Sequence, residues 1–353
     1  MQETGYQKAV EHIHANRERL TETVMQRSGI YLNKHYTRYQ VDKCRQDTIY
    51  NLQYLAESLM LSSPSLWENY VQWLGKLLGS LGLSMQGLAS HFRFLGEVLV
   101  EELDAESANY VKKLTDTASR IVLSDTHINI ITNEATVRFA KEARKYQDLL
   151  LTAQKHKALE YIDHLVENGV SIRQIYLDIL QPVQREIGKL WHMNKISVAQ
   201  EHYCTGISQL AIARLYSKMF NASPRKHKMV SSCVQGELHE LGLRMVTDIM
   251  ELDGWNTFYL GANMPDDSII DMIKQQNADL LAISVTFPLN LHKAEKLVSQ
   301  IRANTEMDKL KILVGGYAFM QDSSLWRKIG ADSFAPNADI ASKVASGLVE
   351  GVS

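Results

Sequence analysis

The stretch KMVSSCVQGELHELG, residues 228–242, decides how the C-terminal part of the chain folds. Residues 228–234 form an apolar run with the length of a buried strand, and Gly236 and its polar neighbours interrupt that run. Apolar residues then recur at helical spacing over 243–252. The stretch therefore predicts a strand, a loop that carries His239, and a helix.

The same alternation continues to the C-terminus. The predicted strands are 229–234, 257–260, 280–285, 311–314 and 333–335, and the predicted helices are 240–252, 266–277, 290–304, 321–329 and 338–349. Strands that alternate with helices indicate parallel βαβ units in a doubly wound, Rossmann-like or flavodoxin-like sheet. In such a sheet ligands bind at the carboxyl ends of the strands, which is where His239 is expected.

The sequence predicts a four-helix unit over residues 150–220, before this sheet. Capping boxes at Ser171 and Ser197 each open a helix, and Pro182 suits the first turn of a helix over 183–192. A long helix from Asn133 to Asn168, stopped by Gly169, is expected to lead into the unit. The polar residues 221–228 are expected to be a linker between the unit and the sheet.

The first third of the chain predicts a helix bundle. Its helical patterns run over 6–26, 36–61, 65–78, 85–102 and 106–123. The aromatic and aliphatic residues of 66–78 stand three and four apart, so we expect them to line the core of the bundle. His12 and His14 are two residues apart and face different sides of a helix, which argues against a metal pair.

The composition narrows the class of protein. Of 353 residues 45% are hydrophobic and 22% are charged, with a net charge of -2, as expected for a globular protein without a dominant nucleic-acid partner. No membrane-span pattern and no signal-peptide pattern is found, so a cytoplasmic location is expected. Cys44, Cys204 and Cys233 are three scattered cysteines, an arrangement that favours neither disulfides nor structural zinc.

Four loops are expected to meet at the carboxyl edge of the sheet, namely 237–242, 261–265, 284–286 and 315–317. The first offers an imidazole, the third two hydroxyls, and the fourth bare glycine backbone that a bulky group can approach closely. Taken singly, each could be an ordinary loop of a flavodoxin-like fold. Together they favour a long flat ligand that enters the sheet edge with a metal above it.

These loops resemble those of the cobalamin-binding domain family, which carries Asp-x-His-x-x-Gly, Ser-x-Leu/Thr and Gly-Gly at this spacing. The resemblance covers about residues 145–350. It implies that His239 is the lower axial ligand of cobalt, within a motif that Gly242 closes. It also implies a slot for the displaced nucleotide tail, lined by Ser284, Thr286, Gly315 and Gly316. Glu237 stands where many members have Asp. Its longer carboxylate can bond the far ring nitrogen of a neighbouring histidine or the corrin periphery, and its role stays open between these two.

The four-helix unit resembles the helical cap of adenosylcobalamin-dependent photoreceptors, and related caps occur on corrinoid carriers of methyl transfer. The similar residues are Trp191 and His192 followed by Glu201 and His202. The resemblance implies that Trp191 packs on the adenosyl group, that Glu201 bonds its ribose, and that His192 binds cobalt after light removes the adenosyl. Without that role Trp191 is a core anchor and His192 a surface residue. Asn194 replaces a common Gly, which suits a left-handed backbone.

Together these features predict a cobalamin-binding light sensor that is not an enzyme, with adenosylcobalamin as cofactor. Its expected domains are a helical partner-binding or dimerisation domain over 1–145, a cap over 146–222 and a Rossmann-like domain over 228–353. We therefore expect a homo-oligomer or a protein signalling partner, and no membrane. The alternative is a corrinoid methyl carrier that uses methylcobalamin, and a third possibility is a regulator that responds to cobalamin level without light.

The N-terminal domain should not bind duplex DNA specifically. Residues 1–140 carry 14 Lys and Arg against 16 Asp and Glu, a net charge of -2, so contact with phosphates would release few counterions. A gel-shift titration in moderate salt should show no sequence-specific complex. A specific shift that disappears when residues 1–140 are deleted would contradict this expectation.

Overall fold

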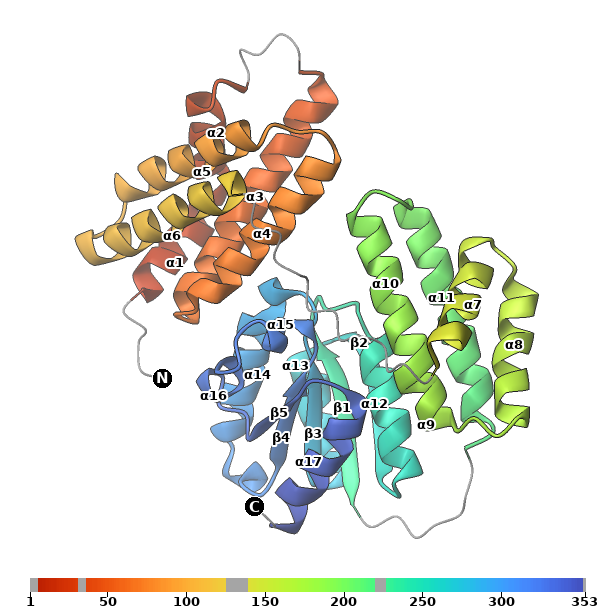
Figure 1. Cartoon of the computed structure of the whole chain (residues 1–353). Helices are drawn as coiled ribbons and strands as arrows, with labels where there is room; N and C mark the ends of the chain where they lie inside the picture. The colour runs from red at the N-terminus through yellow and green to blue at the C-terminus, as the bar shows by residue number, and fades with distance from the viewer. Residues whose placement is uncertain (1–5, 31–35, 125–138, 220–226, 352–353) are drawn as a thin grey trace. The chain divides into compact units, whose positions relative to one another are not determined.

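The computed structural model describes residues 6–30, 36–124, 139–219 and 227–351 (Figure 1). They form two compact units: one holds α1 to α6, together with the stretch Gln321–Leu325, and the other holds the rest from α7 onward. Most of the predicted linker 221–228 and the first residues of the helix predicted from Asn133 lie outside the described ranges. None of the described helices combines the length and the apolar character that crossing a bilayer requires.

The first unit is a helix bundle, as predicted. Its helices are α1 (Gln7–Ala15), α2 (Arg17–Arg27), α3 (Arg38–Met60), α4 (Pro64–Ser80), α5 (Met85–Val100) and α6 (Ala105–Leu123). The single helix expected over 6–26 is divided at Asn16 into α1 and α2. Trp67 is fully buried, donates its indole N–H to Leu114 O at 2.9 Å and meets Phe92 edge to face. The α4 aromatics thus belong largely to the core, although Trp73 remains partly exposed.

The second unit begins with the cap, made of α7 (Ala140–Leu151), α8 (Lys155–Glu167), a continuous helix over 172–192, and α11 (Val198–Tyr216). The long helix expected over 133–168 is wrong, because the chain breaks at Ala153, whose φ of 56° is left-handed. The amides of Ala153 and Gln154 close this end of α7 by donating to Leu150 O and Leu149 O. Gly169, with a φ of 84°, ends α8 as expected.

The helix over 172–192 comprises α9 (Ile172–Gln174), the π-helical turn η3 (Ile175–Leu180) and α10 (Gln181–His192). Two separate helices were expected here because Pro182 suits the first turn of a new helix. The π turn removes the need for a break, since the Gln181 amide donates to Tyr176 O, five residues earlier. Both predicted capping boxes, at Ser171 and Ser197, are present.

The α/β part carries a five-stranded, fully parallel sheet in the order β2-β1-β3-β4-β5. Its elements are β1 (Lys228–Val234), α12 (Leu241–Leu252), β2 (Asn256–Met264), α13 (Asp266–Gln276), β3 (Leu280–Ser284), η4 (Pro288–Asn290), α14 (Leu291–Arg302), η5 (Thr305–Met307), β4 (Lys311–Gly315), α15 (Tyr317–Met320), α16 (Leu325–Lys328), β5 (Ser333–Ala335) and α17 (Ala338–Glu350). This flavodoxin-like order places the switch point between β1 and β3, where such sheets bind ligands.

Two expectations about this part need correction. The loop predicted over 261–265 largely belongs to β2, which pairs with β1 through register shifts that accommodate the positive φ of Gly261 and Asn263. The helix predicted over 321–329 is reduced to the short α16 over 325–328, and the unpredicted α15 precedes it over 317–320. The other strands and helices match the sequence expectation to within a few residues.

Helix α12 joins the cap to the sheet. On one side Leu243 and Met250 pack with α17 and with residues of β1, β3 and β4. On another side Met245 and Ile249 belong to the apolar core of the cap. The buried Asp248 accepts a hydrogen bond from Tyr176 of η3 at 2.8 Å. The cap therefore rests on the helix that directly follows the His239 loop (Figure 1).

Gly316 is required by the sheet itself. Its φ is 97°, and a Cβ at this position would lie 2.3 Å from Val285 O on the neighbouring β3 loop. The amides of Val285 and Ala318 donate to Gly315 O and to Val285 O, so neither loop can move aside without losing these bonds. The glycine thus has a packing reason that does not depend on a ligand.

We predict that Gly316→Ala lowers the stability of the ligand-free protein by at least about 2 kcal/mol, from backbone strain together with overlap at Val285. Thermal unfolding followed by circular dichroism checks this. Gly242→Ala is the matched control, because that position is open and helical, and it should melt like the wild type or slightly higher. Equal melting of Gly316→Ala and wild type would show that the two loops are not tightly joined.

Candidate functional site

The loop between β1 and α12 is held in place from both sides of the switch point. Gly236, with a φ of 81°, turns the chain, and its amide donates to Asn263 Oδ1 at 2.7 Å. The Asn263 amide in turn donates to Glu237 O at 2.9 Å. These two hydrogen bonds hold the loop against β2.

The Glu237 carboxylate is fully buried and joins this loop to the one that follows β3. Its Oε2 accepts the backbone amides of Thr286 at 3.0 Å and Phe287 at 2.8 Å, together with the Asn290 side-chain amide at 3.3 Å. Its Oε1 accepts the His239 amide at 3.0 Å and His239 Nδ1 at 2.6 Å. Five donors around one carboxylate make it a structural anchor and a fixed support for the imidazole.

The surroundings of Glu237 and His239 favour an ionised carboxylate and a single tautomer of the imidazole. Burial on its own raises the pKa of Glu237, but the hydrogen bonds from His239 and Phe287 outweigh it and hold that pKa below its usual value. The hydrogen bond to Glu237 also raises the pKa of His239. With Glu237 ionised, Nδ1 carries the proton that it donates, so in the neutral ring Nε2 is left as the metal-binding atom.

The neighbouring Cys233 does not compete with His239 as a metal ligand. The buried Cys233 thiol donates to His239 O at 3.8 Å, and burial raises the pKa of Cys233 to about 12, so it stays protonated. Within the described residues no three His, Cys, Asp or Glu side chains converge as a metal site. A single imidazole with a fixed tautomer therefore fits a metal that brings its own equatorial ligands, as cobalt does in a corrin.

The space around His239 also fits such a group. The His239 side chain is 64% exposed although its carboxylate partner is fully buried. Gly242 lies in the first turn of α12 with open space where a side chain would stand, so the fold itself does not require glycine there. A bulky ligand above the loop gives both features a reason.

The other predicted loop residues lie along the same sheet edge. Ser284 is the buried last residue of β3 and pairs with Gly315 of β4. Thr286 follows β3 and donates its amide to Glu237. Gly315 and Gly316 leave room for Ala335 O and for the Val285 backbone respectively, so protein packing already accounts for both glycines. Their part in a nucleotide slot stays a prediction.

The cap residues differ in exposure. Trp191 is 37% exposed, whereas the adjacent His192, expected at the surface unless it had a ligand role, is 4% exposed. Glu201 accepts hydrogen bonds from Thr205 and pairs with His202, which is 75% exposed. Asn194 has the left-handed φ of 54° that its position was expected to need.

Glu201 connects the cap to the loop electrostatically. After the larger effects of Glu237 and burial, the Glu201 carboxylate contributes to the raised pKa of His239.

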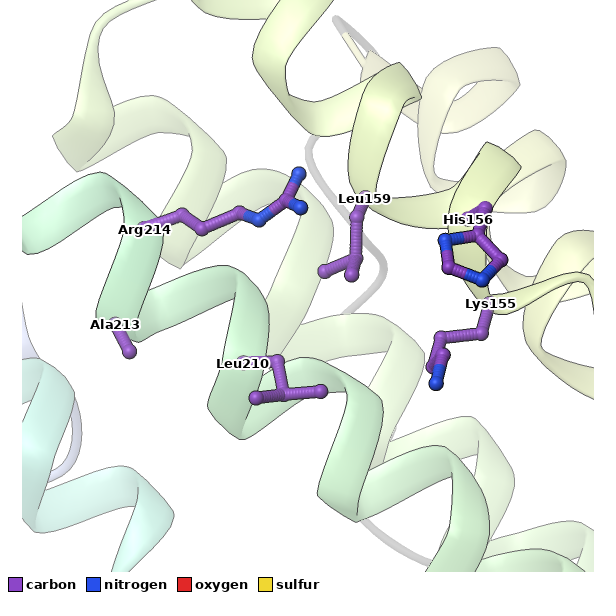
Figure 2. A pocket seen from close by; sticks show the side chains of 6 residues that line it. All are labelled: Lys155, His156, Leu159, Leu210, Ala213 and Arg214. Carbon is purple, nitrogen blue, oxygen red and sulfur yellow. The ribbon is translucent and has the colours of Figure 1, made fainter.

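A separate cavity of about 410 Å³ lies on the cap between α8 and α11 (Figure 2). It is lined by Lys155, His156, Leu159, Leu210, Ala213 and Arg214. None of the predicted site residues lines it, and Arg214 is paired with Asp163 at 2.9 Å. It is therefore distinct from the His239 site.

Sequence reasoning missed several residues that shape the site. Asn290, the last residue of η4, is buried and bonds Glu237, and Asn263, which had no predicted role in the 261–265 loop, fixes Gly236 from within β2. Their amides act through long-range contacts, and nothing in local spacing marks them. Phe287 contributes only its backbone amide, which no side-chain motif can indicate.

Comparison with known protein families gives two matches. Residues 227–344 match the family described as B12 binding domain, and residues 142–216 match a second family with the same description. Residues 1–141 lie outside both matches.

Curated relatives agree with these families. The chain is 25% identical to dimethylamine corrinoid protein 3 of Methanosarcina acetivorans over 204 residues, 55% of this chain and 90% of the relative. It is 24% identical to dimethylamine corrinoid protein 1 of Methanosarcina mazei over 223 residues, 62% and 94% of the two chains. The structure of Methanosarcina barkeri monomethylamine corrinoid protein covers 59% of this chain and 98% of its own, with 20% identity and a TM-score of 0.53, which indicates a shared fold.

The expectation of a light sensor is therefore wrong, because these relatives are corrinoid proteins and none of them is a photoreceptor. An aromatic ring, a carboxylate and imidazoles on a cap can surround an adenosyl or a smaller upper ligand. The pattern of Trp191, His192, Glu201 and His202 hence does not distinguish the two. The role of His192 as a cobalt ligand after light depended on that expectation and is withdrawn.

Residues 142–216 and 227–344 of this chain are thus similar to the B12 binding domain families.

Proposed function

We propose that this chain is a corrinoid protein that carries a methyl group between partner proteins and is not itself the methyltransferase. The observation that carries the proposal is the Glu237–His239 pair, a single imidazole fixed through Nδ1 at the sheet's switch point. The family matches and the corrinoid relatives support it. The bound corrinoid would supply a cobalt centre able to accept a methyl group and give it up.

In this proposal His239 is the lower axial ligand through Nε2, and Glu237 is its positioning residue. The second-shell carboxylate fixes the ring orientation and increases the basicity of the ligand. Gly242 leaves space for the corrin, and Ser284, Thr286, Gly315 and Gly316 border the slot for the nucleotide tail. Leu238 lies between Glu237 and His239 and is 70% exposed. It would supply an apolar contact for the macrocycle.

The cap residues Trp191, Glu201 and His202 would cover the upper face in the same proposal. The partial exposure of Trp191 supports this placement. The domain boundaries that we propose are 1–145, 146–222 and 228–353. A carrier needs at least one protein partner. We propose that the N-terminal bundle contributes to partner binding or to self-association. The proposed location is the cytoplasm.

We predict that His239→Ala abolishes the protein nitrogen ligand and weakens cobalamin binding at least tenfold, because removal of the ligand leaves the metal to water. Spin resonance of the Co(II) form checks this through the nitrogen hyperfine pattern, and spectral titration gives the affinity.

His156→Ala is the matched control, since His156 is an exposed cap histidine that lies outside the proposed site. It should behave like the wild type in both measurements. Retention of the histidine hyperfine pattern in His239→Ala would remove the basis of the proposal.

Glu237→Gln should destabilise the ligand-free protein and weaken cobalamin binding. Both Glu237 oxygens accept backbone amides, so the NH₂ of Gln must face a donor, which costs roughly 1–3 kcal/mol. The amide also supports the imidazole less strongly than a carboxylate does. Thermal unfolding and spectral titration measure the two effects, and an unchanged result in both would argue that Glu237 is not an anchor.

A further inference from the structure

The residue directly after His239 is bonded to the edge strand β2. Glu240 is half-buried, and its Oε2 accepts the Tyr259 hydroxyl at 3.0 Å and the Ala262 amide at 3.0 Å. Both donors belong to β2, whereas the Glu237 carboxylate accepts amides from the loop after β3. The His239 loop is therefore held by two carboxylates, one toward each neighbour of β1 in the sheet.

Helix capping does not account for the Glu240 side chain. Glu240 stands at the N-cap position of α12, where a short side chain commonly accepts an amide of the first helical turn. The Glu240 side chain makes no such bond, and only its backbone oxygen serves the helix, by accepting the Arg244 amide at 2.9 Å. The contact with β2 is therefore the structural role of this carboxylate.

Strand β2 is shaped to receive the Glu240 carboxylate. Its pairing with β1 shifts by one residue between Ser231 and Ser232, and Gly261 beside this shift has a φ of 79°. A Cβ on Gly261 would lie 2.8 Å from Glu240 Oε2, so a larger residue would displace the carboxylate. A strand irregularity of this kind redirects backbone groups, here the Ala262 amide that Glu240 accepts.

The hydroxyl that Tyr259 donates is itself held in place. The Arg244 guanidinium lies over the Tyr259 ring, 5.2 Å from its centre, and Arg244 Nε donates to the buried Asp248 at 2.8 Å. Burial and the Glu240 carboxylate raise the pKa of Tyr259, so its hydroxyl keeps the hydrogen that it donates. Tyr259 therefore offers Glu240 an oriented donor.

We propose that Glu240 is a second positioning residue for the lower ligand: its bonds to β2 hold the backbone directly after His239, as Glu237 holds the imidazole ring. This inference rests on the proposed function and adds a residue to the support of the same site. The orientation of a metal-binding imidazole depends on the groups that fix it. Loss of the β2 contact would let the loop move and would weaken the bond from His239 Nε2 to cobalt.

The test uses the full-length protein, with its histidines labelled with the heavy nitrogen isotope, loaded with Co(II) cobalamin. Spin resonance then gives the ratio of imidazole-bound to unbound cobalt, because the heavy isotope changes the hyperfine pattern and separates it from that of the cofactor's own base. Glu240→Met keeps the length of the side chain and removes its acceptors. It should lower this ratio at least about fivefold, and the Ala262 amide of the ligand-free variant should exchange with solvent faster than in wild type.

Two further variants separate position from charge. Glu240→Gln keeps one oxygen for both donors, and no hydrogen bond to Glu240 Oε1 occurs among the described residues, so the new NH₂ can take that place. Its ratio should stay within about twofold of wild type, because both hydrogen bonds remain. Tyr259→Phe removes one donor only and should lower the ratio by a smaller factor, which keeps the test decisive if Glu240→Met does not fold.

Glu251 provides a matched control at the other end of α12, roughly 16 Å along the helix axis. Its Oε2 also accepts two hydroxyls, those of Tyr216 and Thr257, each at 3.2 Å. Glu251→Met therefore removes a similar pair of hydrogen bonds far from His239. It should lower the melting temperature as Glu240→Met does, but should leave the ratio of imidazole-bound to unbound cobalt unchanged.

Three results would overturn the inference while the proposed function stands. The first is an unchanged ratio in Glu240→Met and Tyr259→Phe, and the second is an equal fall in Glu240→Met and Glu251→Met, which would show a general effect of stability. The third is a Glu240→Gln variant that behaves like Glu240→Met, because charge and not position would then be decisive. A wild-type protein without imidazole-bound cobalt overturns the proposed function, and the inference falls with it.

Discussion

The buried Glu237 carboxylate is the interaction on which the site depends. It lies at the switch point of the sheet, where the loops after β1 and β3 diverge, and it accepts hydrogen bonds from both of them. Removing a partner from a buried charge costs about 3–5 kcal/mol, so the two loops and the imidazole are held together. The arrangement serves stability and ligand orientation at once, because the same carboxylate that closes the sheet edge also fixes the tautomer of His239.

Helix α12, which begins two residues after His239, contacts both the cap and the sheet. Asp248 of α12 is buried and accepts hydrogen bonds from Tyr176 of the cap and from Arg244 of α12 itself. The Arg244 guanidinium lies over the rings of Tyr216 and Tyr259, one from the cap and one from β2. The cap, the ligand loop and the edge strand are thus packed around one short helix. A displacement of the cap would therefore shift the start of α12, beside the proposed cobalt ligand His239.

The residues of the cap are compatible with both of the functions first considered. A photoreceptor and a methyl carrier share a lower ligand and a cap, and they differ in the group that the cap encloses. The cap residues Trp191 and Glu201 suit a small upper ligand as well as a ribose, so these residues alone do not select between the two functions. The corrinoid relatives weigh against a light sensor, and together with the Glu237–His239 pair they support the proposed carrier.

The sequence by itself determined the α/β architecture, the helical cap and the position of His239 in a loop after a strand. These follow from local patterns: apolar runs, capping boxes at Ser171 and Ser197, and a short motif whose residues are neighbours in the chain. Local patterns did not reveal the break at Ala153, where no glycine marks the left-handed turn, or the π turn that carries the helix past Pro182. Only the tertiary structure decided that Glu237 bonds Nδ1 of His239, that Asn290 completes its shell and that Gly316 is needed beside Val285. The contacts of Asn290 and Gly316 join residues on different strands or loops, and the Glu237–His239 bond depends on the burial of Glu237 among them, so their distances are set by the packing of the sheet.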